Sequence, residues 1–298
     1  MCCTHIRSRQ VLPIEERAGR AQTVALCLHQ AELWQQDVQV MQLEENMRVE
    51  RLLSSVTEQA VCDLLRGWAS FLLRLGDGEC THTDATGTEY LRLDDHVVTQ
   101  NMCAPVNSES EVLEMLDLTY GDVTVFRNDW QFWSERAIAT PRHVCVEYIN
   151  NLMLDRLPGN EVICTSADYL SERSPGFDVP LDFLHRQQPS GLPPHQLRLK
   201  VGAVVMLLRN LDPGRGLSNG VRMVVRSIHA NRFLTCQIIT GKRAGDEVLI
   251  PRIKLLPSQA RTPILWVRLQ FPVKVCYCMT INKSQVRRTA SYRTVFGS

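Results

Sequence analysis

The stretch "PSGLPPHQL", residues 189–197, separates two parts of the sequence with different periodicity, and this change limits the fold more than any other feature. Before it, segments with apolar residues at three- and four-residue steps alternate with short apolar strands, which is typical of α/β proteins. After it, short apolar runs are separated by Gly, Asn-Gly and Pro turns, with no helix-length segment between them. The sequence therefore predicts an α/β unit with a small β-rich unit placed within or after it.

The elements expected before the boundary follow from apolar spacing and from turn residues. Pro141 marks the start of one helix, because proline is tolerated in the first helical turn and disrupts a helix interior. The predicted elements, in chain order, are a helix over 15–33, a strand over 37–43, a helix over 49–75, a polar loop or hairpin over 76–90, a strand over 136–140, a helix from 141, and a strand within 160–170.

Charge is balanced over the whole chain but uneven along it. The formal net charge is +1, from 33 Lys and Arg against 32 Asp and Glu, so total charge gives no support for a nucleic-acid partner. From Pro180 onward, nineteen Lys and Arg stand against Asp182, Asp212, Asp246 and Glu247. This asymmetry fits a C-terminal half that faces phosphate, and a solvated basic face is the alternative.

Eleven cysteines are scattered through the chain, and no two of them form a C-x-x-C pair. We therefore predict no metal site, since structural zinc usually relies on that spacing. Cys276 and Cys278 lie in the apolar run "VCYCMTI", which predicts buried, reduced thiols. The sequence shows neither a signal peptide nor an apolar run of 18 residues, so an intracellular, reducing compartment and no membrane partner are expected.

Seven segments in fixed order give the chain a family resemblance, which extends from about Arg9 to Gln285. It resembles the C-terminal half of Pif-family DNA helicases, and in particular the forms encoded by Helitron transposons. The segments are "RQVLPI" (9–14), "LEENMRV" (43–49), "FLLRLGDGE" (71–79), "AIATPRHVCVEYIN" (137–150), "PSGLPPHQLRLKVGAVVMLLRNLDPGRGLSNGVRMVV" (189–225), "GDEVLIPRI" (245–253) and "QFPVKVCYCMTINKSQ" (270–285).

The resemblance implies two RecA-like α/β domains that clamp ATP, with an SH3-like β-barrel, called 2B, inserted in the second. It places the remnant of the first RecA-like domain at 1–45 and the second at 46–180 plus 270–298. The barrel then covers 181–269. This organisation agrees with the α/β and β-rich parts inferred from periodicity.

Two residues match nucleotide-contacting motifs of the family and are the predicted catalytic residues. Gln10 in "RQVLP" is similar to a γ-phosphate sensor, because its amide can donate to phosphate and accept from water. Arg48 in "ENMR" is similar to the arginine that stabilises charge on the transferring phosphoryl group. The alternatives are a surface role for Gln10 and an ion pair of Arg48 with Glu44 or Glu45.

The predicted DNA contacts lie at the ends of two strands. Hydroxyl, amide and ammonium groups there can meet the phosphates of a single strand. They are Thr140 and Arg142 in "ATPRH", and Thr280, Asn282, Lys283, Ser284 and Gln285 in "MTINKSQ". His143 is expected to be an exposed helix-start residue. Val286 stands where the family has glycine, which permits a close backbone approach that valine does not.

Four polar residues flank turns in the predicted barrel. They either shape a DNA-facing surface or maintain the turns themselves. These residues are Arg209, Asn210, Asn219 and Arg222.

Residues that hold ATP in this family are missing from the sequence. Of the sixteen glycines, only Gly241 is followed by lysine, and Arg243 stands where a hydroxyl is needed, so no G-x-x-x-x-G-K-[ST] loop exists. An Asp-Glu box before "RQVLP" and the last arginine-bearing motif are also absent. ATP and Mg²⁺, implied by the family, are therefore not expected to bind this chain alone.

The expected function is that of a C-terminal helicase fragment limited to binding single-stranded DNA, and the expected partner is single-stranded or duplex DNA. The alternatives are a competent 5′–3′ helicase when the missing N-terminal half is supplied, and a non-catalytic interaction module or transposon remnant. The resemblance also implies a nuclear location and roles in DNA repair, recombination and telomere maintenance. It leaves the oligomeric state open.

Overall fold

The computed structural model describes residues 19–26, 46–77, 79–87, 89–91, 103–105, 108–126, 129–171, 179–189, 191–229, 232–257, 265–284 and 291–296. The chain divides into two compact units, residues 1–98 and 99–298, and each is described by itself. No helix within the described ranges has the length and apolar character needed to cross a membrane.

The first unit contains two helices in place of the single helix predicted over 49–75. The hydroxyls of Ser54 and Ser55 donate to the backbone carbonyls of Arg51 and Leu52, and these bonds compete with continuation of the helix. The polar segment that follows forms an antiparallel hairpin, as predicted. The elements are α1 (Arg20–Ala25), α3 (Met47–Leu53), α4 (Gln59–Gly76), β1 (Thr81–Thr83) and β2 (Glu89–Leu91).

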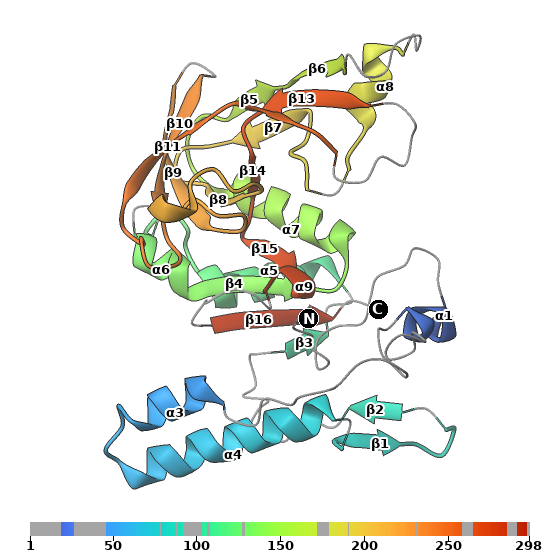
Figure 1. The fold of residues 1–298 in the computed structure, drawn as a ribbon, viewed down its shortest axis with the longest axis vertical. Coiled ribbons are helices and arrows are strands. Elements are labelled where there is room, and N and C mark those ends of the chain that lie inside the picture. The colour runs from blue at the N-terminus through green and yellow to red at the C-terminus, as the bar shows by residue number, and fades with distance from the viewer. Residues whose placement is uncertain are drawn as a thin grey trace, which may run out of the picture. The chain divides into compact units, whose positions relative to one another are not determined.

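The second unit contains a parallel sheet with strand order β15-β4-β16-β3 (Figure 1). Helices α5, α6 and α7 pack against β4, and α7 also packs against β15. The strand predicted at 136–140 is confirmed as β4. The bounds are β3 (Cys103–Pro105), α5 (Glu109–Tyr120), α6 (Trp130–Glu135), β4 (Arg136–Thr140), α7 (His143–Arg156), β15 (Cys278–Thr280), α9 (Ile281–Ser284) and β16 (Ser291–Phe296).

An antiparallel sheet of order β11-β10-β9-β8-β14 forms the β-rich part of the same unit. Along β10, buried and half-buried residues alternate, as expected for a strand with one face on a core. The predicted closed barrel is not confirmed, because the described strands form an open sheet with β11 and β14 at its edges. The bounds are β8 (Val204–Leu207), η2 (Pro213–Arg215), β9 (Arg222–His229), β10 (Phe233–Ile238), β11 (Glu247–Pro251) and β14 (Val273–Val275).

Two smaller sheets complete the unit, with orders β12-β13-β6 and β5-β7. The prediction of a single strand within 160–170 is wrong. This segment contains two strands, which belong to different sheets and are separated by Ser166. The backbone N–H of Ser166 donates to the carbonyl of His195 at this break. The bounds are β5 (Val162–Thr165), β6 (Ala167–Leu170), α8 (Leu181–Arg186), β7 (Gln196–Leu199), β12 (Ile253–Leu255) and β13 (Trp266–Gln270).

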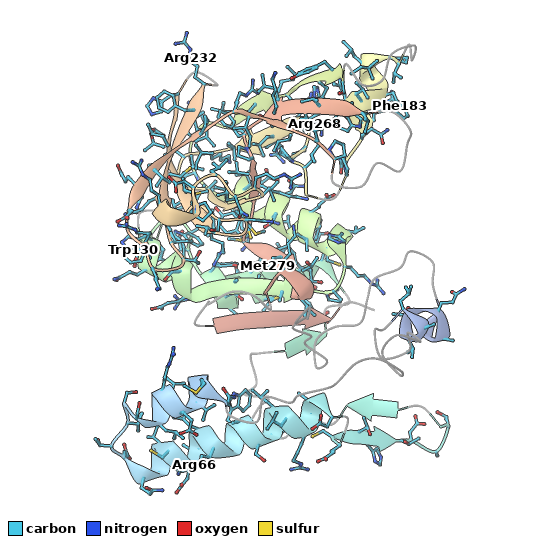
Figure 2. All side chains as sticks on the ribbon, in the orientation of Figure 1. Arg66, Trp130, Phe183, Arg232, Arg268 and Met279 are labelled. Carbon is cyan, nitrogen blue, oxygen red and sulfur yellow. The ribbon has the colours of Figure 1, made fainter. Side chains whose placement is uncertain are left out.

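The core of the second unit joins the parallel and antiparallel sheets. Val204 of β8 and Val224 of β9 belong to the same buried cluster as Ile138 of β4. Strands β14 and β15 are separated only by Cys276 and Tyr277, so one segment passes from one sheet to the other (Figure 1). Figure 2 shows side chains filling the space between these elements, with Met279 on β15 and Arg268 on β13. The prediction of a mixed α/β fold is confirmed, and the proposed domain boundaries stay predictions.

Candidate nucleic-acid interface

Two predicted DNA-contacting threonines lie next to each other at the carboxyl edge of the parallel sheet. Thr140 is the last residue of β4 and Thr280 the last of β15, and the two are register partners. Each strand leads directly into a helix, α7 or α9. Ligands of open α/β sheets bind at the carboxyl ends of the strands, so this edge is the natural position for a site.

Thr140 is the most unusual residue at this edge. Its side chain is fully buried, and its Oγ1 has no hydrogen-bond partner within the part of the chain that the structure describes. A buried hydroxyl left without a partner costs about 1–3 kcal/mol. Thr280 beside it is 8% exposed, so the pair lies just beneath the surface. The edge thus holds a buried hydroxyl without a hydrogen-bond partner among the described residues.

The turn after Thr140 adds backbone donors and a cation. Pro141 follows the strand, and Arg142 has the extended conformation of an N-cap residue (φ −103°, ψ 132°). The side chain of the N-cap residue makes no capping hydrogen bond to the first turn of α7, and N–H groups of such a turn favour an anion. Arg142 is exposed, and His143 is an exposed helix-start residue, as predicted.

The remaining predicted DNA contacts fall on or beyond α9. Lys283 lies in this helix and is half-buried. Asn282 and Ser284 are also in α9, but the structure does not describe their side chains, and Gln285 lies outside the described residues. Among the predicted residues, the structure therefore brings together Thr140, Arg142, Thr280 and Lys283 at the two strand ends, and their contacts with DNA stay predictions.

Strand β15 is fixed in place by a buried amide on α7. Asn150 Oδ1 accepts from the backbone N–H groups of Tyr277 (2.8 Å) and Cys278 (2.9 Å), and its Nδ2 donates to the Cys278 carbonyl (3.0 Å). The Tyr120 hydroxyl donates to the Tyr277 carbonyl at 2.6 Å. We did not predict a role for Asn150 from the sequence. The available signal was a polar residue four positions after buried Val146, which interrupts the apolar face of this helix.

Replacing Asn150 with alanine is expected to lower the free energy of unfolding by about 2–3 kcal/mol, because three buried backbone groups lose their partner. Urea unfolding followed by tryptophan fluorescence measures the change. Asn151→Ala is the matched control, since Asn151 is the next residue of α7 and is exposed. Equal effects of the two substitutions would contradict the anchoring role of Asn150.

Two tyrosine hydroxyls and one cysteine thiol beneath the site are neutral at physiological pH. Burial raises the pKa of the Tyr120 and Tyr277 hydroxyls well above the ordinary value. Burial, together with the neighbouring Cys276 thiol, also raises the pKa of the Cys278 thiol. A thiolate nucleophile is therefore not available from Cys278. The backbone donors and the cation at this edge suit binding of an anion.

The structure does not describe the side chains of the two predicted nucleotide contacts. Gln10 lies outside the described residues, and Arg48 lies in α3 with its side chain outside the description, so both roles stay predictions. Within the described ranges, one group of side chains has metal-ligating geometry, namely Asp168, His185 and His195. Mg²⁺ prefers oxygen ligands, so this imidazole-rich group does not fit a magnesium nucleotide.

Turn chemistry accounts for two of the four polar residues predicted to flank barrel turns. Asn210 Oδ1 accepts from the backbone N–H of Asn219 at 2.7 Å. Arg222 is fully buried, and its guanidinium donates to the carbonyls of Cys276 and Trp133. A DNA-facing role for Arg222 is therefore wrong. Arg209 donates to the carbonyls of Leu208 and Leu256, which is also a local structural role.

Comparison with known proteins finds similarity in two separate segments. Residues 7–86 match the family model described as PIF1-like helicase, and residues 182–228 match that of the 2B domain of DNA helicase Pif1. The chain is 32% identical over 145 residues to the ATP-dependent DNA helicase Pif1 of Bdellovibrio bacteriovorus, covering 49% of this chain and 30% of that protein. It is 35% identical over 91 residues to the Xenopus laevis ATP-dependent DNA helicase PIF1, covering 30% of this chain and 14% of that protein.

The chain thus spans less than a third of the length of these curated relatives. Among solved structures, unliganded Pif1 from Bacteroides sp. has a TM-score of 0.38 at 18% identity, covering 58% of this chain and 53% of that one. Pif1 helicase from Candida albicans also has a TM-score of 0.38, at 20% identity, covering 59% and 45%. TM-scores at this level add nothing to the fold described above.

Proposed function

This chain belongs to the Pif1-like helicase family, and from that premise we propose that it binds single-stranded DNA at the carboxyl edge of its parallel sheet. The observation that carries the proposal is the buried Thr140 hydroxyl, which lacks a partner in the described part of the chain. A phosphate oxygen is a strong acceptor for such a hydroxyl, and phosphate contacts supply most of the affinity for a single strand.

Three neighbouring features support phosphate as the ligand. The first turn of α7 has no hydrogen bond from the side chain of its own N-cap residue, and helix N-termini favour an anion. Arg142 precedes this turn, and Lys283 lies in α9 after the adjacent strand. Donors and positive charge therefore meet at the ends of two neighbouring strands. These contacts recognise the sugar–phosphate backbone and carry no base sequence information.

ATP-driven unwinding is proposed only for an assembly or a longer product that supplies the phosphate-binding loop. Positioning and charge neutralisation by that loop and its metal provide nearly all of phosphoryl-transfer catalysis. The sequence contains no such loop, and Gln10 and Arg48 do not replace it. In that setting we propose that the segment 181–269 acts as the 2B part of the helicase.

Salt-dependent DNA binding tests the proposal. A fluorescently labelled oligothymidine is titrated with the purified 298-residue chain over about 50–200 mM salt. We expect affinity to fall linearly on a log–log plot. Arg142→Gln and Lys283→Gln should each reduce the magnitude of the slope by about 0.7, the value for loss of one phosphate contact on a single strand.

Lys242→Gln is the matched control for charge. Lys242 is exposed in the turn between β10 and β11, outside the proposed site, so the same loss of one positive charge should leave the slope unchanged. The proposed site would be contradicted if the chain did not bind the oligonucleotide at the lowest salt, or if all three variants changed the slope equally.

A further inference from the structure

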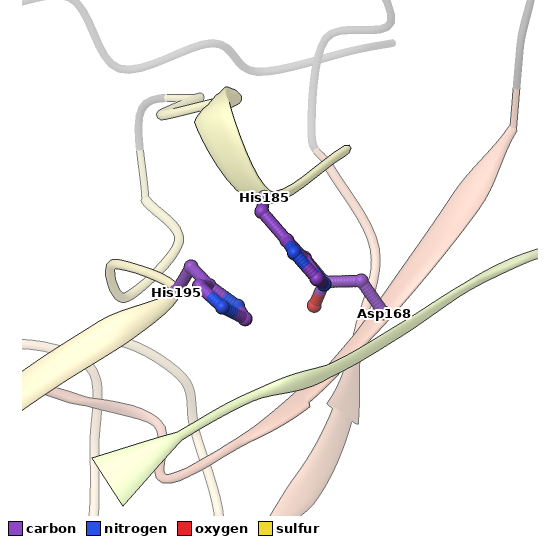
Figure 3. A group of neighbouring side chains, drawn as sticks. All are labelled: Asp168, His185 and His195. Carbon is purple, nitrogen blue, oxygen red and sulfur yellow. The ribbon is translucent and has the colours of Figure 1, made fainter. Parts of the chain in front are cut away.

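We propose that Asp168, His185 and His195 form a binding site for Zn²⁺ or a similar transition-metal ion. The three residues come from β6, from α8 and from the turn before β7, and their possible ligand atoms all lie within 4.8 Å of one another. Figure 3 shows the three side chains converging from these separate elements. This histidine cluster, defined as Asp168, His185 and His195, lies outside the parallel sheet and does not rest on the proposed DNA binding.

A hydrogen-bond network prepares His195 to act as a ligand. The Ser166 hydroxyl donates to Asp168 Oδ1 at 2.7 Å and lies 2.8 Å from His195 Nδ1. A hydroxyl has one hydrogen, and an ionised carboxylate only accepts, so His195 Nδ1 must carry the proton shared with Ser166. The lone pair of this imidazole then resides on Nε2. Metal-bound histidines are oriented in the same way, through a hydrogen bond from the other ring nitrogen.

Asp168 is held in a fixed orientation by donors to both of its oxygens. Its buried carboxylate accepts from Arg268 Nη2 at 2.7 Å, from Ser166, and from Arg268 Nε, which lies 3.0 Å from Oδ1 and 3.1 Å from Oδ2. The single hydrogen on Nε is shared between the two oxygens, so a metal ion would take one of these two shared positions and leave the hydrogen to the other. Hydrogen bonds of this kind to a ligating carboxylate are a common feature around metal sites.

The donor set selects the class of metal. Two imidazoles and one carboxylate suit Zn²⁺ and related ions, whereas Mg²⁺ and Ca²⁺ prefer oxygen ligands alone. Bonds of about 2.0–2.1 Å at tetrahedral angles bring donor atoms to about 3.4 Å from one another. The cluster therefore needs a contraction of at most about 1.4 Å from the observed limit of 4.8 Å.

Side-chain rotation supplies this contraction. The His185 and His195 rings are stacked, with centroids 3.7 Å apart and planes inclined by 15°, so they must turn toward a shared ion. His185 is 29% exposed and His195 is half-buried, which gives both rings room to turn and gives an ion a path from solvent. Three protein ligands leave the fourth tetrahedral position for water.

Cobalt spectroscopy on the full chain provides the test, because Co²⁺ occupies zinc sites and absorbs visible light when it is tetrahedral. The chain is treated with chelator, kept reduced with a phosphine, and titrated with Co²⁺. We expect one tightly bound Co²⁺ per chain, displaced by Zn²⁺, with visible bands and without thiolate-to-cobalt charge transfer. The last criterion separates this site from adventitious binding by the eleven cysteines.

Three variants locate the ion. Ser166→Ala should weaken Co²⁺ binding by about 10–100-fold, the usual effect of losing a residue that orients a ligand. His185→Gln, which removes a ligand from a partly exposed position, should weaken it further. His229→Gln is the matched control, since His229 is exposed and bonds to Ser227 and Thr235 outside the cluster.

Two results would overturn the proposal. One is a wild-type chain that binds no Co²⁺ with nitrogen and oxygen ligands, which would show that the network holds the fold with hydrogen bonds alone. The other is an equal loss of affinity in the His185 and His229 variants. Far-ultraviolet circular dichroism of each variant establishes that a loss of binding is not a loss of fold.

Discussion

The Arg268→Met variant is expected to lose about 3–5 kcal/mol of unfolding free energy, because Asp168 keeps its buried charge without a counter-ion. Both side chains are fully buried. Arg268 also donates to the backbone carbonyls of Leu184, Gln187 and Pro193, so its removal detaches α8 and the following turn from β13. Urea unfolding measures the change, and Trp266, whose ring centroid lies 4.9 Å from the guanidinium carbon, reports on the same region.

Arg222→Met is the matched control for this prediction. Arg222 is also fully buried, but its described partners are backbone carbonyls, and its Nη2 has no partner among the described residues. Removing it leaves no buried carboxylate behind and relieves an unpaired guanidinium nitrogen, so we expect less than half the loss. A loss for Arg222→Met as large as that for Arg268→Met would show that counter-ion removal is not the dominant cause.

Thr140→Val is expected to change stability and DNA affinity in opposite directions. Valine removes a buried hydroxyl without a described partner, so the free energy of unfolding should rise by about 1 kcal/mol. If that hydroxyl donates to a DNA phosphate, the variant loses a hydrogen bond to a charged group, worth about 1.5–3 kcal/mol. Oligonucleotide affinity should then fall by about 10–100-fold, measured by fluorescence anisotropy at low salt.

Thr119→Val separates the two effects. Thr119 is also buried, but its hydroxyl donates to the Met115 carbonyl at 2.7 Å within α5. This variant should lose about 1 kcal/mol of stability and keep the wild-type affinity for DNA. If Thr140→Val destabilises the chain as Thr119→Val does, or binds DNA with unchanged affinity, the hydroxyl of Thr140 is not the phosphate contact.

Local patterns predicted the elements whose partners are near in sequence. β4 and α7 follow from an apolar run, a proline and a helical stripe, and each lies within a few residues of its predicted range. The break between α3 and α4 was missed because serine hydroxyls compete there for backbone carbonyls. The break at Ser166 was missed because it depends on a bond to His195, which is 29 residues away.

The functional residues also fall into those that local sequence patterns predict and those that they do not. Thr140 and Thr280 were predictable, because polar residues at the ends of two apolar strands become neighbours when those strands pair in parallel. The histidine cluster was not predictable from spacing, since its ligands and their supports come from four elements with no common motif. The prediction of no metal site was based on the lack of a C-x-x-C pair, and this cluster contains no cysteine.

The short passage from β14 through Cys276 and Tyr277 into β15 has a mechanical consequence. Four residues separate Val275, which pairs with β8, from Thr280 at the proposed DNA contact, and the Asn150 side chain of α7 binds the backbone in the middle of that span. Such a linkage is too short and too firmly held to act as a hinge. We therefore expect that a tilt of the antiparallel sheet would also shift the carboxyl edge of the parallel sheet, where the proposed DNA contact lies.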